Sequence, residues 1–159
     1  MSRKDNEVRV TPSVLDRLLD FEPRNQNEAP KSKSRSVAEL KQSVRRDLEW
    51  LLNSRSYHTE IDEKSEEIKK SVVTYGLPDF TGMSVRNRHD MNKLRKAVED
   101  AIKRFEPRFL DVKLVVDEPD NKDRMIRFRI EAFLNMEPAP EPITFDTVLE
   151  LGSGDFVVK

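Results

Sequence analysis

The pattern of apolar positions divides the chain into a helical half and a strand half. From Ser36 to Phe105 apolar residues recur three and four positions apart, which predicts helices with one buried face. Ser36 and Glu39 have the spacing of a capping box, so we expect a long helix to begin at Ser36. Trp50 falls off the apolar stripe and either anchors a partner or packs against the following loop. The stripe consists of Val37, Leu40, Val44, Leu48, Leu51 and Leu52.

Two further helical segments follow this helix. Apolar residues at positions 61, 68, 72 and 75 keep helical phase, and Gly76 followed by Leu77 and Pro78 predicts a left-handed helix end. Asn87 or Ser84 can cap the last helix of this half. Its stripe consists of Met91, Leu94, Val98, Ala101, Ile102 and Phe105.

Beyond residue 109 the apolar period changes from helical to two, which predicts strands over 110–116, 126–134, 143–151 and 156–158. Polar residues alternate with the apolar ones, so one face of the sheet is expected to meet solvent. The prediction is an α+β domain with two to three helices packed on one face of a small, mainly antiparallel sheet. Such a sheet has edges, which either are protected by charges and the Pro-rich loop 137–142 or accept a strand from another chain.

The first 35 residues form an arm with a different composition. Thr11 can cap a short helix over 11–19 with Pro12 at its first position, and this helix carries a small apolar stripe. From Asp20 to Arg35 the chain is polar, which is typical of a linker. We therefore divide the chain into an arm, 1–35, with a short tethered helix, and a domain, 36–159. The short helix docks either on its own domain or on a partner.

The two halves of the domain meet at Phe105-Glu106-Pro107-Arg108-Phe109. A residue before proline is disfavoured in the helical conformation, so the helix must end here and the joint is expected to be extended. Alternation would then place Phe105, Pro107 and Phe109 on one face, and Glu106 and Arg108 on the other. The simpler interpretation is a helix stop with a surface ion pair of ~0 to 1 kcal/mol. The same four letters, Phe-Glu-Pro-Arg, occur at 21–24 in a polar stretch, so only the position of the motif gives it weight.

Composition and charge exclude several classes of function. The chain has 159 residues, 37% of them charged, and a net charge of −1, which argues against nucleic-acid binding or binding to an anionic membrane. Bases are in excess over 86–108 and acids over 131–159, which suits a polar contact with another protein or a solvated helix face. No apolar run is long enough for membrane insertion, so the protein is expected in the cytoplasm.

Sites for catalysis or cofactors are not evident in the sequence. The chain has no cysteine, two histidines far apart, and four glycines that form no phosphate-binding loop, so we expect no metal, no cofactor and no nucleophilic catalysis. The one enzyme class permitted is glycoside hydrolysis, which needs two carboxylates around a sugar. Glu49, Asp79 and Glu106 are the candidates, although no pattern implies a cleft between them.

Three ordered segments resemble the TssE family of type VI secretion baseplate subunits. They are VRRDLEWLLNSR at 44–55, SVVTYGLPDF at 71–80 and IKRFEPRF at 102–109, and PSVLDRL at 12–18 is similar as well. That family is similar to the small baseplate wedge protein of contractile phages, historically labelled a lysozyme. The resemblance implies a structural component beside TssF and TssG, connected with TssK, in a cytoplasmic baseplate docked at the inner membrane complex.

The resemblance also gives the joint a role. The Glu-Pro-Arg motif of the family maps onto Glu106, Pro107 and Arg108, which implies a structural or partner-binding site. The family domain is similar to the strand-exchanging part of the sheath subunits TssB and TssC, so an edge strand is expected to start the sheath by strand addition. The alternatives are a peptidoglycan-cleaving, muramidase-like glycoside hydrolase and a generic adaptor unrelated to secretion.

Overall fold

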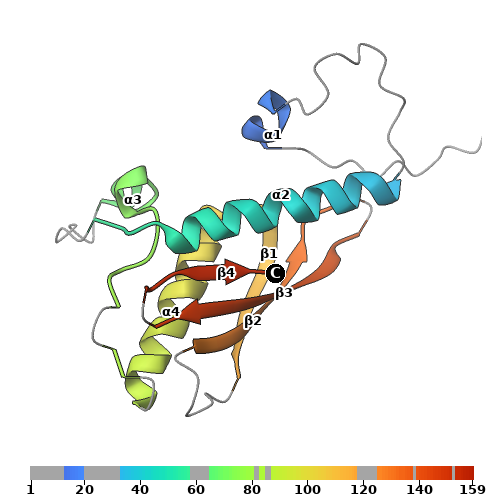
Figure 1. Ribbon diagram of the computed structural model, residues 1–159. Coiled ribbons are helices and arrows are strands. Elements are labelled where there is room, and N and C mark those ends of the chain that lie inside the picture. Colours follow the sequence, from blue (N-terminus) through green and yellow to red (C-terminus); the bar gives the residue numbers. More distant parts are fainter. Residues whose placement is uncertain are drawn as a thin grey trace, which may run out of the picture.

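The structure, a computed structural model, describes residues 13–19, 33–57, 65–80, 83–84, 87–117, 125–137, 139–151 and 153–159 (Figure 1). Its helices are α1 (Val14–Leu18), α2 (Lys33–Asn53), α3 (Glu66–Lys69), the 3-10 helix η1 (Val72–Thr74) and α4 (Arg88–Phe105). Its strands are β1 (Phe109–Val116), β2 (Met125–Leu134), β3 (Glu141–Glu150) and β4 (Phe156–Val158).

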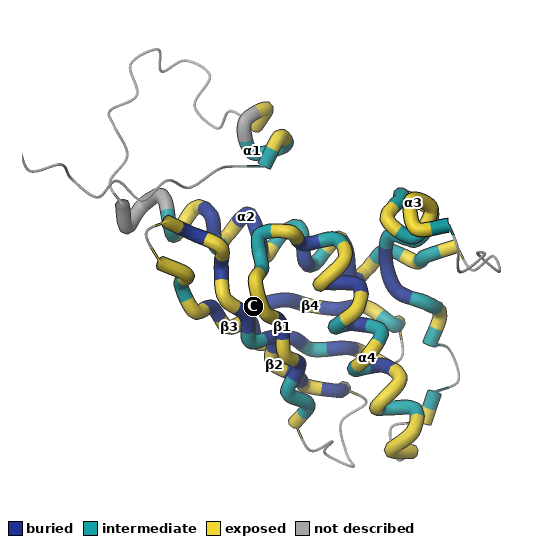
Figure 2. Tube along the Cα trace, turned by 180° about the vertical axis from the view of Figure 1, so that it is seen from behind, coloured by how far each residue is buried: buried dark blue, intermediate teal, exposed yellow. Residues whose placement is uncertain are grey.

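The strands form one antiparallel sheet in the order β1-β2-β3-β4, so each strand pairs with its neighbour in sequence. Buried and exposed residues alternate along β2 and β3, as Figure 2 shows in dark blue and yellow. The central pairing of Ile130 with Leu114 on one side and Phe145 on the other places three buried side chains in a row. The predicted α+β fold is confirmed.

The helices α2 and α4 cover one face of the sheet and supply the rest of the core. Val44 and Leu48 of α2, Ile102 of α4 and Ile126 of β2 are all 0% exposed. The predicted stripes of both long helices are therefore the buried faces. No helix among the described residues is long and apolar enough to cross a membrane.

Both predicted starts of the N-terminal helices differ from the observed ones. The helix α2 is already helical at Lys33, so Ser36 lies inside it and the predicted cap at Ser36 is wrong. Lys33 and Arg35 are good helix formers, which is sufficient to extend the helix by most of a turn. The helix α1 is capped by Ser13 in a capping box with Asp16, and the predicted cap Thr11 lies outside the described residues.

The predicted helix over 61–75 is also wrong in its described part. Only α3 and η1 are helical there, and Val72 is 84% exposed. Ser71 and Thr74 donate side-chain hydrogen bonds to the carbonyls of Ile68 and Lys69, which competes with a continuous helix. The predicted left-handed glycine is confirmed, because Gly76 has φ +105°.

Candidate functional site

The joint between α4 and β1 is a tight turn and not an extended segment. The Phe109 N–H donates to the Glu106 carbonyl at 3.2 Å, and the Glu106 N–H still donates to Ile102 of α4 at 2.8 Å. The turn reverses the predicted faces, so that Glu106 is 4% exposed whereas Pro107 is exposed. The predicted end of the helix at Phe105 is confirmed, and the predicted alternation along the joint is wrong.

Arg108 holds the buried carboxylate of Glu106 with two hydrogen bonds. Its Nε donates to Glu106 Oε1 at 2.6 Å and its Nη2 to Oε2 at 2.5 Å, which is the bidentate geometry of a strong charge-assisted pair. The same guanidinium donates to Asp47 Oδ2 at 2.7 Å and to Ser43 Oγ at 3.1 Å, both on α2. The simpler interpretation of a surface ion pair is therefore wrong, because the pair lies between the joint and α2.

The network continues from α2 to α1. Asp16 of α1 accepts hydrogen bonds from Ser43 Oγ at 2.6 Å and from Arg46 Nη2 at 2.9 Å. Arg46 also donates to Asp47 Oδ1 at 2.7 Å, and Arg108 Nη1 lies 4.0 Å from Asp16 Oδ2. The short helix therefore contacts its own domain, as the position of α1 beside α2 shows in Figure 1. We call this set the arginine cluster: Asp16, Ser43, Arg46, Asp47, Glu106 and Arg108.

Hydrogen bonds within the arginine cluster favour the charged forms of Asp16 and Arg108. Burial raises the pKa of Asp16, but hydrogen bonds from Ser43, Ser13 and Arg46 outweigh burial and hold this pKa at about 2. Burial lowers the pKa of Arg108, but the hydrogen bonds and charges of Glu106 and Asp47 outweigh it and raise this pKa above its usual range. The cluster joins three segments of the chain by fixed charges.

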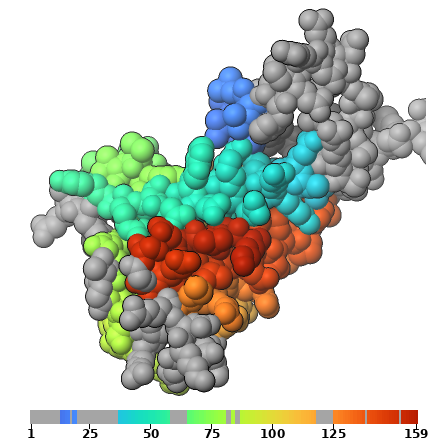
Figure 3. Space-filling model, in the orientation of Figure 1, coloured from blue at the N-terminus to red at the C-terminus, as the bar shows by residue number. Residues whose placement is uncertain are grey.

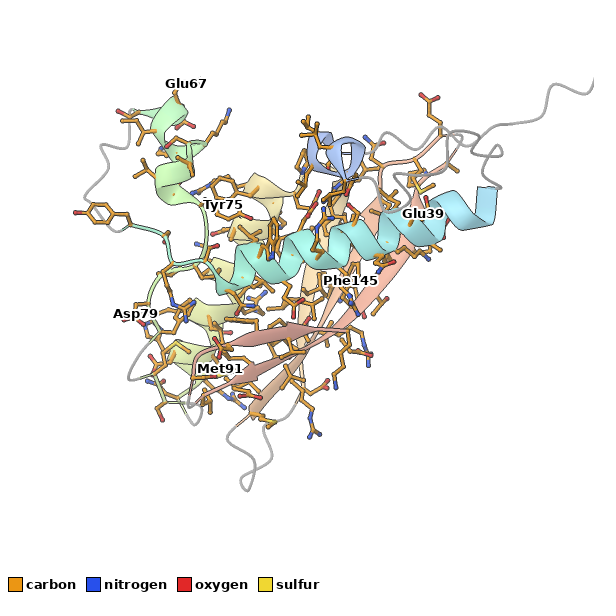
Figure 4. The ribbon with its side chains drawn as sticks, turned by 45° about the horizontal axis from the view of Figure 1, so that its top comes forward. Glu39, Glu67, Tyr75, Asp79, Met91 and Phe145 are labelled. Carbon is orange, nitrogen blue, oxygen red and sulfur yellow. The ribbon has the colours of Figure 1, made fainter. Side chains whose placement is uncertain are left out.

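The three candidate hydrolytic acids lie in different surroundings. Both carboxylate oxygens of Glu106 accept hydrogen bonds from Arg108, so this side chain is part of the arginine cluster. Glu49 is half-buried on α2, and Asp79 is exposed on a loop well away from α1 (Figure 4). Within the described ranges no group of three acids or histidines could hold a metal ion.

The sequence analysis did not single out Ser43, Asp47 and Asp16 as parts of a site. Ser43 and Asp47 are four positions apart on α2 and directly precede the buried residues Val44 and Leu48. Polar residues at helical spacing beside an apolar stripe indicate a buried polar contact, and that signal was available. Their partner Arg108 lies 61 residues from Asp47, which no local pattern reveals.

Both outer strands of the sheet have part of their free edge covered by side chains. The outward N–H of Leu114 in β1 donates to Glu99 Oε1 of α4 at 3.0 Å. In β4 the Phe156 N–H donates to Asn53 Oδ1 at 2.8 Å, and Asn53 Nδ2 donates to the Phe156 carbonyl at 2.9 Å. Asn53, the last residue of α2, thus takes the place of a neighbouring strand.

Among the described residues, no strand lies beside the N-terminal half of β3 on the side of β4. The strand β4 pairs only with Thr147–Leu149, whereas β3 begins at Glu141 (Figure 1). Lys159 N–H donates to the Asp146 carbonyl, and backbone groups of alternate residues point to the same side of a strand. The N–H and carbonyl of Thr144 and the carbonyl of Pro142 therefore point away from β2.

These backbone groups face a groove between β3 and α2. We call it the β3 groove; its lining residues are Lys41, Gln42, Arg45, Pro142, Ile143, Thr144, Phe145 and Lys159. Figure 4 shows Phe145 beneath α2, and Figure 3 shows α2 lying along the C-terminal strands on this side of the molecule. An extended segment in this groove could continue the line of β4 and pair with β3.

Comparison with models of protein families gave a match. The model of the family described as "Baseplate wedge protein gp25" matches residues 38–139, more than half of the chain. The matched residues include the members of the arginine cluster on α2 and at the joint, and end before β3. A search of curated proteins found no match.

Proposed function

We propose that this chain, which belongs to the baseplate wedge protein gp25 family, is the TssE subunit of a type VI secretion baseplate and starts the contractile sheath by strand addition. Family membership gives the coarser role directly: the chain is a structural component of a phage-like baseplate. The proposed action is non-enzymatic, and the proposed location is the cytoplasmic side of the inner membrane complex.

The edge of β3 that no described strand covers is the observation that supports strand addition. Thr144 offers one donor and one acceptor, and Pro142 offers an acceptor, beside a groove open to an extended segment. Backbone groups at a sheet edge recognise any extended chain, and side-chain pockets then decide which one binds. We therefore assign this edge to a strand of a sheath subunit, TssB or TssC.

We assign the arginine cluster a positioning role. Arg108 connects the joint to Asp47 of α2, and β1 begins at the next residue, Phe109. A rotation of the sheet relative to α2 would break these charge-assisted bonds and would change the width of the β3 groove. Glu106, Pro107 and Arg108 thus hold the sheet in the orientation that leaves the edge open, while other surfaces contact TssF, TssG and TssK.

The test is a proline substitution at the proposed edge. Because the Thr144 N–H points away from β2, Thr144→Pro keeps the β2–β3 ladder and removes the outward donor. We expect this variant to co-purify with TssF and TssG but to lose TssB and TssC. Thr144→Val, which keeps the N–H, is the matched control and should retain all partners. Retention of the sheath subunits by a folded Thr144→Pro protein would refute strand addition at β3.

A further inference from the structure

We propose that the strand accepted by the β3 groove is acidic, with at least one carboxylate side chain directed towards α2. This inference rests on the proposed function and adds the chemistry of the partner segment. It comes from the distribution of charge around the groove, which differs from that of the chain as a whole. The chain has a net charge of −1, whereas the groove is bordered by Lys41, Arg45 and Lys159.

Two of these three cations have no carboxylate partner among the described residues. Lys41 Nζ lies 3.1 Å from Glu141 Oε1 and is neutralised there. Arg45 and Lys159 form no ion pair within that part of the chain, although Lys159 fixes its backbone to Asp146. The groove therefore carries positive charge that an added segment would meet.

The geometry of β3 decides which side chains of an added strand meet this charge. Ile143 and Phe145 are 6% and 5% exposed and point to the helix side of the sheet, whereas Thr144 points to the opposite face. Strands side by side share their faces, so every second residue of the added strand would also point towards α2. Those residues would lie beside Ile143 and Phe145 and near Arg45.

The opposite face provides no comparable preference. There Asp146 Oδ1 accepts from Arg129 Nε at 3.0 Å. Glu131 lies opposite Thr144 in β2, and Lys159 lies opposite Asp146, so charges of both signs are present on that face. An added strand that carries apolar and acidic residues on one face is therefore expected to bind with that face towards α2. A strand with lysines at the same positions would place like charges together, which is unfavourable in an interface.

The test uses two labelled peptides of about ten residues with the same alternating apolar pattern. One carries glutamates at two of the positions on one face, and the other carries lysines there. We expect fluorescence anisotropy to show at least about tenfold tighter binding of the glutamate peptide at low salt, with the difference reduced in 0.5 M NaCl. The double variant Arg45→Glu/Lys159→Glu should reverse the preference. Lys113→Glu, on exposed β1, is the matched control and should not change it.

The outcomes separate this inference from strand addition itself. If the peptides bind equally, or neither binds at millimolar concentration, the acidic preference is wrong. Strand addition is judged separately by the loss of sheath subunits from Thr144→Pro. An unchanged preference in the double variant also overturns the inference, because the selectivity would then originate elsewhere.

Discussion

Replacement of Arg108 by alanine tests the arginine cluster most directly. The substitution removes both bonds to Glu106, whose side chain is 5% exposed, and the bond to Asp47. Loss of one partner of a buried ion pair costs about 3 to 5 kcal/mol, because the remaining charge is left uncompensated. Since Arg108 is itself 18% exposed and water can enter its place, we expect a loss of about 3 kcal/mol.

The assay is equilibrium unfolding in urea at pH 7, with the Arg129→Ala variant as control. Arg129 forms an ion pair with Asp146 of the same type, but the two side chains are 46% and 72% exposed. An exposed pair contributes little to stability, so the control should lose little of its free energy of unfolding.

A double variant separates an uncompensated charge from lost packing. In Glu106→Gln/Arg108→Met both charges are absent, so we expect the free energy of unfolding to recover by about 1 to 2 kcal/mol relative to Arg108→Ala. Equal, small losses in Arg108→Ala and Arg129→Ala would refute the reasoning. They would mean that Glu106 is hydrated in solution and that the cluster does not hold the joint.

Two further predictions concern Asp16 and Thr147. The pKa of Asp16 is lowered from 3.8 to about 2, so the contact of α1 with α2 should be stable above pH 4 and be lost as pH falls through about 2. Asp16→Asn should weaken that contact by about 1 to 2 kcal/mol at pH 7, measured as faster amide exchange in α1. Thr147 Oγ1 is buried and has no hydrogen-bond partner among the described residues, so Thr147→Val should raise the free energy of unfolding by about 1 kcal/mol in urea. Unchanged exchange in Asp16→Asn, or a less stable Thr147→Val, would contradict these two expectations.

The sequence predicted those parts of the fold that depend on local periodicity. The buried faces of α2 and α4 follow from apolar residues at helical spacing, and the strands β1, β2 and β3 follow from alternation over seven or more residues. Pro107 was enough to predict the end of α4, because the effect of proline is local. The predicted extended joint failed since the turn is fixed by Arg108, whose partners Ser43 and Asp47 are remote in sequence.

The site was only partly predictable for the same reason. Glu106 and Arg108 stood out through the resemblance to a known family, whereas Asp16 contributes from a helix in the arm. No local rule states that an acid in a five-residue helix will meet Arg46 across a polar stretch of sequence. The open part of the sheet could not be predicted either, because the sequence states only that edges exist.

The covered parts of the two sheet edges strengthen the argument for the open one. Glu99 accepts a hydrogen bond from the backbone of β1, and Asn53 accepts one from the backbone of β4. These backbone groups are therefore not free to pair with another chain, and proteins protect edge strands in this way. A sheet that merely tolerated exposed edges would not need these contacts. Within the part of the chain that the structure describes, the half of β3 before Thr147 borders the β3 groove, where a new strand would extend the line of β4. Protection at the outer strands combined with access at β3 would direct an incoming strand to a single position and a single register, and sheath assembly would then begin in a defined orientation.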